Sequence, residues 1–404
     1  MDIYGDKLNP YRLEKVQNAL RGTKTHHVIT HNPSSISPNE TLYVRLPKLK
    51  NDMLFVPDSI YLSGDLEIKG DAGNYVGDNV GRNLIRKLVV KIGGEIVYDL
   101  SNYNIFMKYK DLWLTKEQRE NRIFQGIQSS KLRKVRSGIE VTDSTNEKLL
   151  YTIFGKKYKI PLDLEILTRH APLYTYALHS DIIIEITFVD EAYPIVSSKK
   201  DDINYQLNNI CLEYDTIENE MLANMVESLY NQGYVFMYDF VQLFKTMKLT
   251  PDQTIVNENI NLPKKSIKGI LLVFYKNHEF GNPYINKIEI TIEGISNKIF
   301  SQHMRHLDHY EEAKKYFLDE NRKEDEQSNV TLTDYYTGYK YALWIDLRST
   351  DFSKLHNSGY KLQNTKDGIQ LHIEKIGNET PCHIFVVSDC QVGIQNKQIV
   401  NFQQ

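Results

Sequence analysis

Two segments of this sequence, residues 87–94 (KLVVKIGG) and residues 287–294 (KIEITIEG), share one pattern. Each begins with lysine, continues with an apolar residue at every second position and ends in glycine. Successive side chains of a β-strand point to opposite faces, so alternation with period two is typical of a strand with one buried face. The pattern therefore predicts two similar strands, one in each half of the chain.

The elements that follow these two strands are also repeated. Each strand is followed by a glycine, a short strand and a helix, which we place at residues 104–114 and about residues 304–317. A long polar loop comes next, then a tyrosine-led strand that ends in Asp-Leu, and then an aspartate-led strand. The tyrosine-led strands are residues 158–164 and 341–347, and the aspartate-led strands are residues 181–186 and 367–373. The offset of roughly 185–200 residues is much longer than a solenoid repeat, so we interpret the chain as one β domain used twice.

This repeat determines the predicted fold class. Each half has about eight strands that alternate, which favours antiparallel sheets packed face to face, because a single sheet would leave its apolar face in water. Eight strands per unit suit a jelly roll, although the pattern by itself leaves an immunoglobulin-like strand order open. We therefore predict an all-β protein with short inserted helices and long connecting loops, built as two tandem eight-stranded jelly rolls (a double jelly roll).

Composition suggests where the domains begin and end. Residues 1–38 are interpreted as an N-terminal arm, and residues 31–40 (HNPSSISPNE) are rich in turn-forming residues. The polar segment at residues 197–206 is a candidate boundary, followed by a strand at residues 207–217 and an amphipathic helix at residues 218–230. We place the first jelly roll at residues 39–200 and the second at residues 201–404.

Charge and cysteine content exclude several classes of protein. The chain has 49 Lys and Arg and 52 Asp and Glu, a net charge of -3, so nothing in its overall charge indicates binding to nucleic acid or membranes. Its three cysteines (Cys211, Cys382 and Cys390) are an odd number without metal-like clustering, which fits a reducing compartment. No apolar signal-peptide region opens the chain, and the longest apolar run, residues 269–275, is too short to span a bilayer. We expect a soluble protein made inside a cell, without a membrane span.

Histidines offer the most plausible metal ligands in the sequence. His303, His306 and His309 are three residues apart, ahead of Glu311 and Glu312, so part of the set could share one helix face. The triplet drifts around the helix, however, and no H-E-x-x-H motif is present. A polar helix face is the better interpretation.

Other catalytic patterns are weaker still. The arm contains His26, His27 and His31, but a cupin-type metal enzyme needs an H-x-H pair, which occurs nowhere in the chain. Lys264 and Lys265 lie in a segment without the leading glycine of a phosphate-binding loop, and no G-x-S-x-G nucleophile elbow exists. We predict no enzyme, and no catalytic, cofactor-binding or metal-ligating residue.

A basic loop is the one candidate for contact with nucleic acid. It contains Lys131, Arg133, Lys134 and Arg136, which could contact DNA phosphates or acidic proteins. No aromatic residues are interleaved with these cations, so a solvated loop is favoured. The run at residues 319–326 mixes both signs of charge and is interpreted as a surface loop.

Three blocks of the second half resemble a known family. They are residues 211–225 (CLEYDTIENEMLANM), residues 260–277 (INLPKKSIKGILLVFYKN) and residues 344–375, which begin WIDLRSTDFSKLHNSGYK. The residues that carry the resemblance are Leu212, Glu213, Tyr214, Asp215, Asn261, Leu262, Pro263, Ser266, Lys268, Phe274, Asp346, Leu347, Arg348, Ser349, Leu355, His356, Ser358, Gly359, Asp367 and Gly368. In these blocks the chain is similar to the double jelly-roll major capsid proteins of polintons, adintoviruses, virophages and adenovirus-like dsDNA viruses, and most of all to the polinton-like group. Asn357 departs from the family pattern, in which a glycine is expected.

The resemblance implies that the protein acts by assembly. In that family three protomers, each with two jelly rolls side by side, form a pseudo-hexagonal homotrimer, and trimers cover an icosahedral shell around a dsDNA genome. The expected partners are other copies of the chain, penton and minor capsid proteins and, weakly, packaged DNA. The expected location is the virion, after synthesis in the host cytoplasm or nucleus. Loops at residues 71–82 and 318–335 would face outward, and the N-terminal arm would bind a neighbouring capsomer or a minor protein.

Two alternatives stay open at the level of sequence. A carbohydrate- or receptor-binding β-sandwich, such as a spike or lectin, would have similar strands without the shell. A metal-dependent β-barrel enzyme would need stoichiometric zinc or iron. The oligomeric state of the protein and its metal content distinguish these alternatives from the capsid interpretation.

Overall fold

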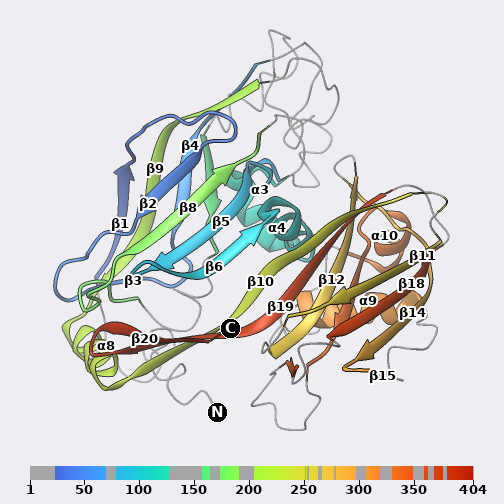
Figure 1. The fold of residues 1–404 in the computed structure, drawn as a ribbon. Helices are drawn as coiled ribbons and strands as arrows, with labels where there is room; N and C mark the ends of the chain where they lie inside the picture. Colours follow the sequence, from blue (N-terminus) through green and yellow to red (C-terminus); the bar gives the residue numbers. More distant parts are fainter. Residues whose placement is uncertain are drawn as a thin grey trace. The chain divides into compact units, whose positions relative to one another are not determined.

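The computed structural model describes residues 23–69, 79–127, 157–163, 173–190, 204–250, 252, 254–262, 266–276, 279–296, 306–318, 330–348, 359–362, 368–375 and 380–403. The chain divides into two compact units, and most of their longer elements are labelled in Figure 1. The first unit is drawn from Met1–Asn104, Asn121–Asp239 and Cys390–Gln403, and the second from Ile105–Glu120, Phe240–Asp389 and Gln404. These units are defined by packing, so the predicted bounds of the arm and of the two jelly rolls along the sequence stay a prediction.

The first unit contains two antiparallel sheets. One sheet has the order β1-β9-β4-β7, with β3 also paired to β9, and the other has the order β2-β8-β5-β6. The strands are β1 (Thr23–Thr30), β2 (Thr41–Arg45), β3 (Met53–Phe55), β4 (Tyr61–Lys69), β5 (Ile85–Ile92), β6 (Glu95–Ser101), β7 (Lys157–Pro161), β8 (Ile182–Phe188) and β9 (Asn204–Glu218).

The second unit repeats this arrangement. One sheet has the order β10-β19-β12-β13, with β16 and β17 paired to β12 and β20 paired to β19, and the other has the order β11-β18-β14-β15. The strands are β10 (Tyr234–Leu249), β11 (Ile255–Ile260), β12 (Ser266–Lys276), β13 (Glu279–Phe280), β14 (Ile285–Ile292), β15 (Ile295–Ser296), β16 (Ala342–Asp346), β17 (Tyr360–Lys361), β18 (Ile369–Lys375), β19 (Thr380–Gln395) and β20 (Gln398–Gln403). The division by packing assigns the first residues of β10, the last residues of β19 and the whole of β20 to the first unit.

The order of strands confirms the jelly roll. If β3 of the first unit and β13, β17 and β20 of the second are set aside, eight described strands remain in each, and numbering them along the chain gives the same two sheets twice. The first, eighth, third and sixth strands form one sheet, and the second, seventh, fourth and fifth form the other. Such connections between two packed antiparallel sheets are those of a jelly roll, not of an immunoglobulin domain. The prediction of two tandem jelly rolls with inserted helices is confirmed.

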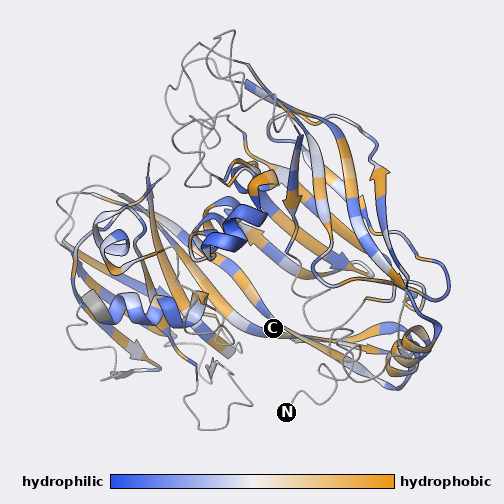
Figure 2. Cartoon of the chain, turned by 180° about the vertical axis from the view of Figure 1, so that it is seen from behind, coloured by the Kyte–Doolittle hydropathy of each residue, from blue (hydrophilic) through white to orange (hydrophobic). Residues whose placement is uncertain are grey.

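The two lysine-led segments of the sequence occupy equivalent places in the two units. In the first unit Val90 of β5 lies opposite Ile184 of β8, and in the second Ile290 of β14 lies opposite Leu371 of β18. Both pairs of strands carry a register shift at the same point, just before the lysine that opens the segment. The apolar residues of both segments are buried, and Figure 2 shows hydrophobic and hydrophilic residues alternating along the strands of each unit. Period-two alternation therefore predicted these strands correctly.

The helices lie in the connections between strands. They are α3 (Val80–Asn83), α4 (Tyr103–Leu112), α5 (Lys116–Asn121), the 3-10 helix η2 (Ile123–Gln125), α8 (Glu220–Gln232), α9 (His306–Phe317) and α10 (Leu332–Thr337). α4, α8 and α9 confirm the three predicted helices to within a few residues at each end. The side chain of Asn219 accepts a hydrogen bond from the N–H of Leu222 at the start of α8, and Gly233 follows its last turn.

Aromatic side chains fill the helical side of the second unit. Tyr109 of α4 makes edge-to-face contacts with Phe280 and Phe317, at ring centroid distances of 5.1 Å each. Trp344 of β16 stacks on Tyr316 of α9 with the centroids 3.9 Å apart. Because α4 comes from the first half of the sequence, the core of the second unit is built from both halves of the chain.

A buried histidine makes the stability of the second unit depend on pH. His383 lies in β19 with 7% of its surface exposed, and its Nδ1 is 3.0 Å from the hydroxyl oxygen of Thr246 in β10. Burial lowers the pKa of His383 to about 4, because a charged imidazolium would lose its hydration at this position. The unfolded chain would take up a proton near the ordinary histidine pKa of about 6.5, so acid favours unfolding between these two values.

We expect acidification from about pH 7 to about pH 5 to lower the free energy of unfolding by about 2 kcal/mol through His383. The substitution His383→Gln retains a polar side chain that can bond to Thr246, and it should remove this part of the pH dependence. Thr246→Val, which removes the hydroxyl next to His383 and retains the imidazole, is the matched control and should keep the pH dependence. Urea unfolding across this pH range measures the effect, and equal pH slopes for His383→Gln and the unaltered protein would contradict it.

Candidate functional site

Strand β1 forms one edge of the first unit, where it pairs with β9 across a separation of almost two hundred residues. All eight residues from Thr23 to Thr30 have register partners, running from Thr23 opposite Glu218 to Thr30 opposite Cys211. Threonine, valine and isoleucine supply five of the eight residues, and these β-branched side chains favour extended backbone. The sequence did not predict this strand, because both of its faces are exposed and it lacks an apolar alternation.

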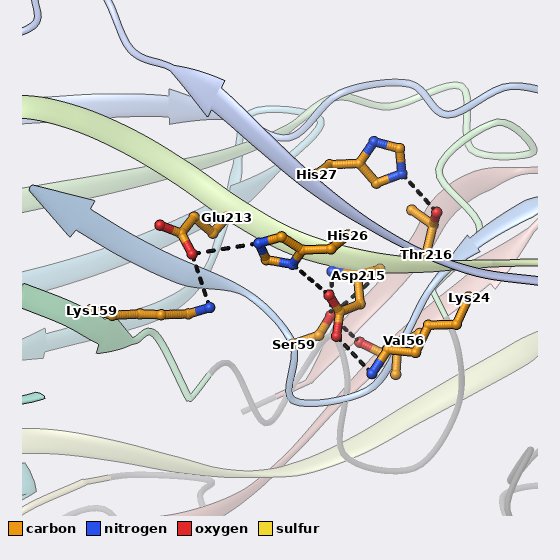
Figure 3. Close-up of polar contacts among 9 residues, drawn as sticks. All are labelled: Lys24, His26, His27, Val56, Ser59, Lys159, Glu213, Asp215 and Thr216. Carbon is orange, nitrogen blue, oxygen red and sulfur yellow. Dashed lines mark hydrogen bonds and ion pairs between the residues drawn. The ribbon is translucent and has the colours of Figure 1, made fainter. Parts of the chain in front are cut away.

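The outer face of this strand pair carries a cluster of charges, drawn in Figure 3. His26 of β1 lies directly opposite Asp215 of β9, and the distance from His26 Nδ1 to Asp215 Oδ1 is 2.7 Å. The ammonium of Lys24 is 2.8 Å from the other carboxylate oxygen of Asp215. The second ring nitrogen of His26 is 3.6 Å from the carboxylate of Glu213. Two acidic residues of β9 therefore hold two basic residues of β1.

Glu213 is the most enclosed member of the cluster. It is 4% exposed, and its carboxylate lies 2.9 Å from the ammonium of Lys159 and 3.4 Å from that of Lys157, both in β7. Burial by itself would raise the pKa of Glu213, but the hydroxyl of Ser63 and the two ammonium groups outweigh burial and lower the pKa to about 2. The carboxylate is therefore charged at neutral pH and joins β1, β9 and β7.

Replacing Glu213 by glutamine should lower the free energy of unfolding by about 2 kcal/mol at neutral pH, because charged hydrogen bonds are lost at a buried position. The depressed pKa gives the sign of the pH effect: this stabilisation is fully present above about pH 4.5 and disappears as the pH falls toward 2. Asp190→Asn, at a carboxylate that is 60% exposed, is the control and should change stability by less than about 1 kcal/mol. Thermal unfolding at neutral and acidic pH tests the prediction. An equal effect of Glu213→Gln at pH 7 and pH 2.5 would contradict it.

Asp215 is fixed through its backbone as well as its side chain. Its N–H donates to the hydroxyl of Ser59 over 3.1 Å, and its carbonyl accepts a hydrogen bond from the N–H of Val56 over 3.0 Å. Burial would raise the pKa of Asp215, but hydrogen bonds from Lys24 and His26 outweigh it and lower the pKa. The carboxylate that receives β1 is therefore held rigidly in place.

The other face of the strand pair continues into the core. His27 Nε2 is 2.8 Å from the hydroxyl of Thr216, and its ring stacks on Tyr214 with the centroids 5.0 Å apart. Tyr214 in turn contacts Phe55 of β3 at 4.8 Å. The described charges of this site are all paired with one another, so the arrangement is suited to holding a strand in place and offers no isolated nucleophile or base.

Comparisons with known proteins were informative at the level of structure. No protein-family model and no curated protein matches the sequence. The Faustovirus major capsid protein superposes on the chain with a TM-score of 0.63 at 7% identity, over 94% of this chain and 91% of that one. VP54 of PBCV-1, fitted into a reconstruction of the virophage Sputnik, gives 0.60 at 12% identity, over 95% and 97%. The mavirus major capsid protein gives 0.51 at 10% identity, over 93% and 89%.

These likenesses cover both units of the chain and all but a small part of each of the three proteins. The chain has a double jelly-roll fold. The structural neighbours are major capsid proteins of double jelly-roll viruses, as the three sequence blocks implied. At these identities the likeness concerns the fold, and the roles of individual residues rest on the geometry of this chain.

Some of the described residues that carry the sequence resemblance join neighbouring strands; Pro263, Ser349, Leu355, His356, Asn357, Ser358 and Asp367 lie outside the described residues. Glu213 and Asp215 receive β1, as described above. In the second unit Asp389 of β19 accepts hydrogen bonds from the hydroxyl of Ser266 and from the N–H of Gly359, both over 2.6 Å, and pairs with Lys268 at 2.9 Å. A Cβ at Gly359 would lie 2.3 Å from the carbonyl carbon of Ile267, so a side chain there would collide with the neighbouring strand. These contacts support the pairing of neighbouring strands.

The histidines considered as metal ligands have other partners. His309 is buried, with its Nδ1 3.1 Å from the hydroxyl of Tyr341, and His31 lies in the arm with its Nε2 2.8 Å from the carbonyl oxygen of Tyr43. Glu312 pairs with Lys315 at 2.6 Å. Among the described residues no three His, Cys, Asp or Glu side chains are placed to hold a metal ion.

Several predictions concern residues outside the described part of the chain. They are His303 and the side chain of His306, Lys264 and Lys265, the basic loop from Lys131 to Arg136, and the charged run at residues 319–326. Within the part of the chain that the structure describes, every helix is too short or too polar to cross a lipid bilayer. The prediction that the chain has no catalytic, cofactor-binding or metal-ligating residue stays a prediction.

Proposed function

We propose that this chain is a major capsid protein, which forms homotrimeric, pseudo-hexagonal capsomers that assemble into an icosahedral shell around a dsDNA genome. The observation that carries the proposal is the pair of identical strand orders in one chain. It is supported by the superposition of more than nine tenths of this chain on the Faustovirus and mavirus major capsid proteins. Its activity is assembly, and the chain acts as a structural protein of the virion.

Duplication of the jelly roll suits this function for a geometric reason. Three copies of a chain with two similar units present six similar units around a three-fold axis. Such a closed ring approximates six-fold symmetry and can tile a surface with hexagonal outlines. A single jelly roll would need six copies to make a tile of the same outline.

Exposed apolar side chains on each unit are suited to contacts between copies. In the first unit Tyr43, Met221 and Met237 are each more than half exposed, and in the second unit so are Tyr284 and Tyr339. Tyrosine and methionine are enriched in the cores of protein interfaces, because each buries a large area. The 27 tyrosines of the chain fit extensive self-association. The other proposed partners are penton and minor capsid proteins, with weak contact between the basic loop and packaged DNA.

Light scattering after size-exclusion chromatography tests the proposal. We expect a particle of about 141 kDa, three times the chain mass of 47.1 kDa. Negative-stain images of the concentrated protein should show hexagonal tiles or closed shells. A stable monomer at every concentration that also binds glycans would contradict the proposal and favour the carbohydrate-binding alternative. Production would take place in the host cytoplasm or nucleus, before incorporation into virions.

A further inference from the structure

Strand β1 is weakly anchored by its own side chains. Seven of its eight residues are exposed and only His27 is half-buried, with Val28 and Ile29 exposed by 54% and 43%. Burial of apolar surface is the main force that fixes a strand in a sandwich, so β1 contributes little to the core. Its attachment depends on the backbone ladder to β9, on the polar pairs of Lys24 and His26, and on the contacts of His27 with Thr216 and Tyr214.

The strand that receives β1 has the opposite character. Leu212, Glu213, Tyr214 and Thr216 of β9 are all at most 4% exposed. Without β1, the edge of β9 would present unpaired backbone groups next to buried apolar and charged side chains, which is a template for any strand that fits. β9 is therefore a buried strand held in the core, whereas β1 is an exposed edge strand paired with it.

The pairing with β9 continues past the end of β1. The N–H of His31 donates to the carbonyl of Ile210 over 2.8 Å, and the carbonyl of Ser34 accepts from the N–H of Ile210 over 3.1 Å. Ile36 is 2% exposed and exchanges two backbone hydrogen bonds with Leu207, over 2.8 and 3.0 Å. Residues 23–36 are therefore attached to β9 as one continuous segment, which would be exchanged as a whole. Fully extended, a segment of this length reaches about 45 Å at most.

We propose that β1 is exchanged between copies of this chain, so that β1 of one copy pairs with β9 of the next in the assembled oligomer. This inference rests on the self-association proposed above and names the element that carries it. The sequence of β1 is complementary to this edge, because it forms eight register pairs with β9 and its Lys24 and His26 face Asp215 and Glu213. Exchange of an identical element retains every one of these contacts, so it costs little and ties neighbouring copies together.

A cysteine introduced on β1 tests the exchange, because Thr30 lies directly opposite the native Cys211. Directly opposed residues of antiparallel strands have Cα atoms about 4.5–5.5 Å apart, within the range that a disulfide requires. Thr30→Cys changes an exposed side chain, and the other native cysteines, Cys382 and Cys390, are buried. Mild oxidation of the assembled protein should then form a disulfide between β1 and the β9 strand with which it is paired, in the same copy or in another.

Exchange predicts covalent species with two or three times the chain mass on a non-reducing gel, reversed by reductant. The double substitution Thr30→Cys with Cys211→Ser, and the unaltered protein, should both run as single chains. Thr23→Cys, which faces Glu218, controls for random collision. If light scattering shows a trimer but the disulfide between residue 30 and Cys211 forms only within single chains, the proposed exchange of β1 is wrong and the proposed function stands. If the protein is monomeric under all conditions and the disulfide forms within single chains, the proposed exchange and the proposed function are both wrong.

Discussion

Replacing Arg82 with alanine is expected to lower the free energy of unfolding by about 3–5 kcal/mol, the cost of removing one partner of a buried ion pair. Arg82 lies in α3 and is 0% exposed. Its guanidinium pairs with the carboxylate of Asp163, and it donates to the hydroxyl of Tyr103 over 2.7 Å and to the carbonyl oxygen of Pro161 over 2.5 Å. One side chain therefore joins α3, the end of β7 and the start of α4.

The size of the effect follows from what the substitution leaves behind. Alanine would remove all three contacts at once, so the Pro161 carbonyl and the Tyr103 hydroxyl would lose a donor. The carboxylate of Asp163, which is also 3.8 Å from Arg122, would lose its nearest cation. Unsatisfied buried polar groups cost more than the net gain of the bonds they make. Lysine retains the charge but not the planar fork of donors, so Arg82→Lys should be intermediate.

Chemical unfolding monitored by circular dichroism measures the effect of Arg82→Ala. Arg86→Ala is the matched control, because Arg86 is 39% exposed and is 3.3 Å from an exposed carboxylate, that of Asp190. We expect a loss of less than about 1 kcal/mol for this control. Similar losses for the two substitutions would show that the buried arginine does not hold the first unit together.

Trp344→Ala is expected to destabilise the second unit by about 3–5 kcal/mol, the usual cost of truncating a buried aromatic side chain. Trp344 is fully buried in β16, opposite Leu271 of β12, and stacks on Tyr316 with the ring planes 14° apart. A Cβ added at Gly269 would lie 2.3 Å from the indole ring, so the ring fills the space that this glycine leaves open. The surrounding strands cannot collapse into the cavity without breaking their pairing.

The loss should come from packing rather than from hydrogen bonding. Among the described residues the indole N–H of Trp344 has no hydrogen-bond partner, so truncation removes no such bond. Trp344→Phe should accordingly cost less, about 1–2 kcal/mol, because most of the volume is retained. Leu332→Ala, at an exposed position of α10, is the control and should stay within about 0.5 kcal/mol. Calorimetry of the three variants measures these differences, and a loss for Trp344→Phe equal to that for Trp344→Ala would contradict a packing origin.

Much of the fold could be predicted from the pattern of apolar residues. Period-two alternation located β5, β8, β14 and β18, and the repeated order of elements revealed the duplication. Alternation works for these strands because each has one face against the core and one toward solvent. It failed for β1, since a strand with both faces exposed has no reason to alternate.

The candidate site was only partly predictable. Glu213 and Asp215 were singled out by resemblance, and His26 and His27 were considered as ligands of a metal. Nothing in the spacing indicated that His26 and Asp215, which are 189 positions apart, lie opposite each other. Likewise, α4 follows strands of the first unit, yet most of it packs in the second unit.

The sequence by itself determined the strands that have one buried face, the main helices, and that one domain is used twice. These are local properties, because side-chain alternation and backbone freedom act over a few neighbouring residues. Only the tertiary structure decided which strand pairs with which, where α4 packs, and that Arg82 and Glu213 are enclosed by opposite charges. Pairing and burial depend on groups that are far apart in the chain, so their energies are fixed only when the sheets have formed.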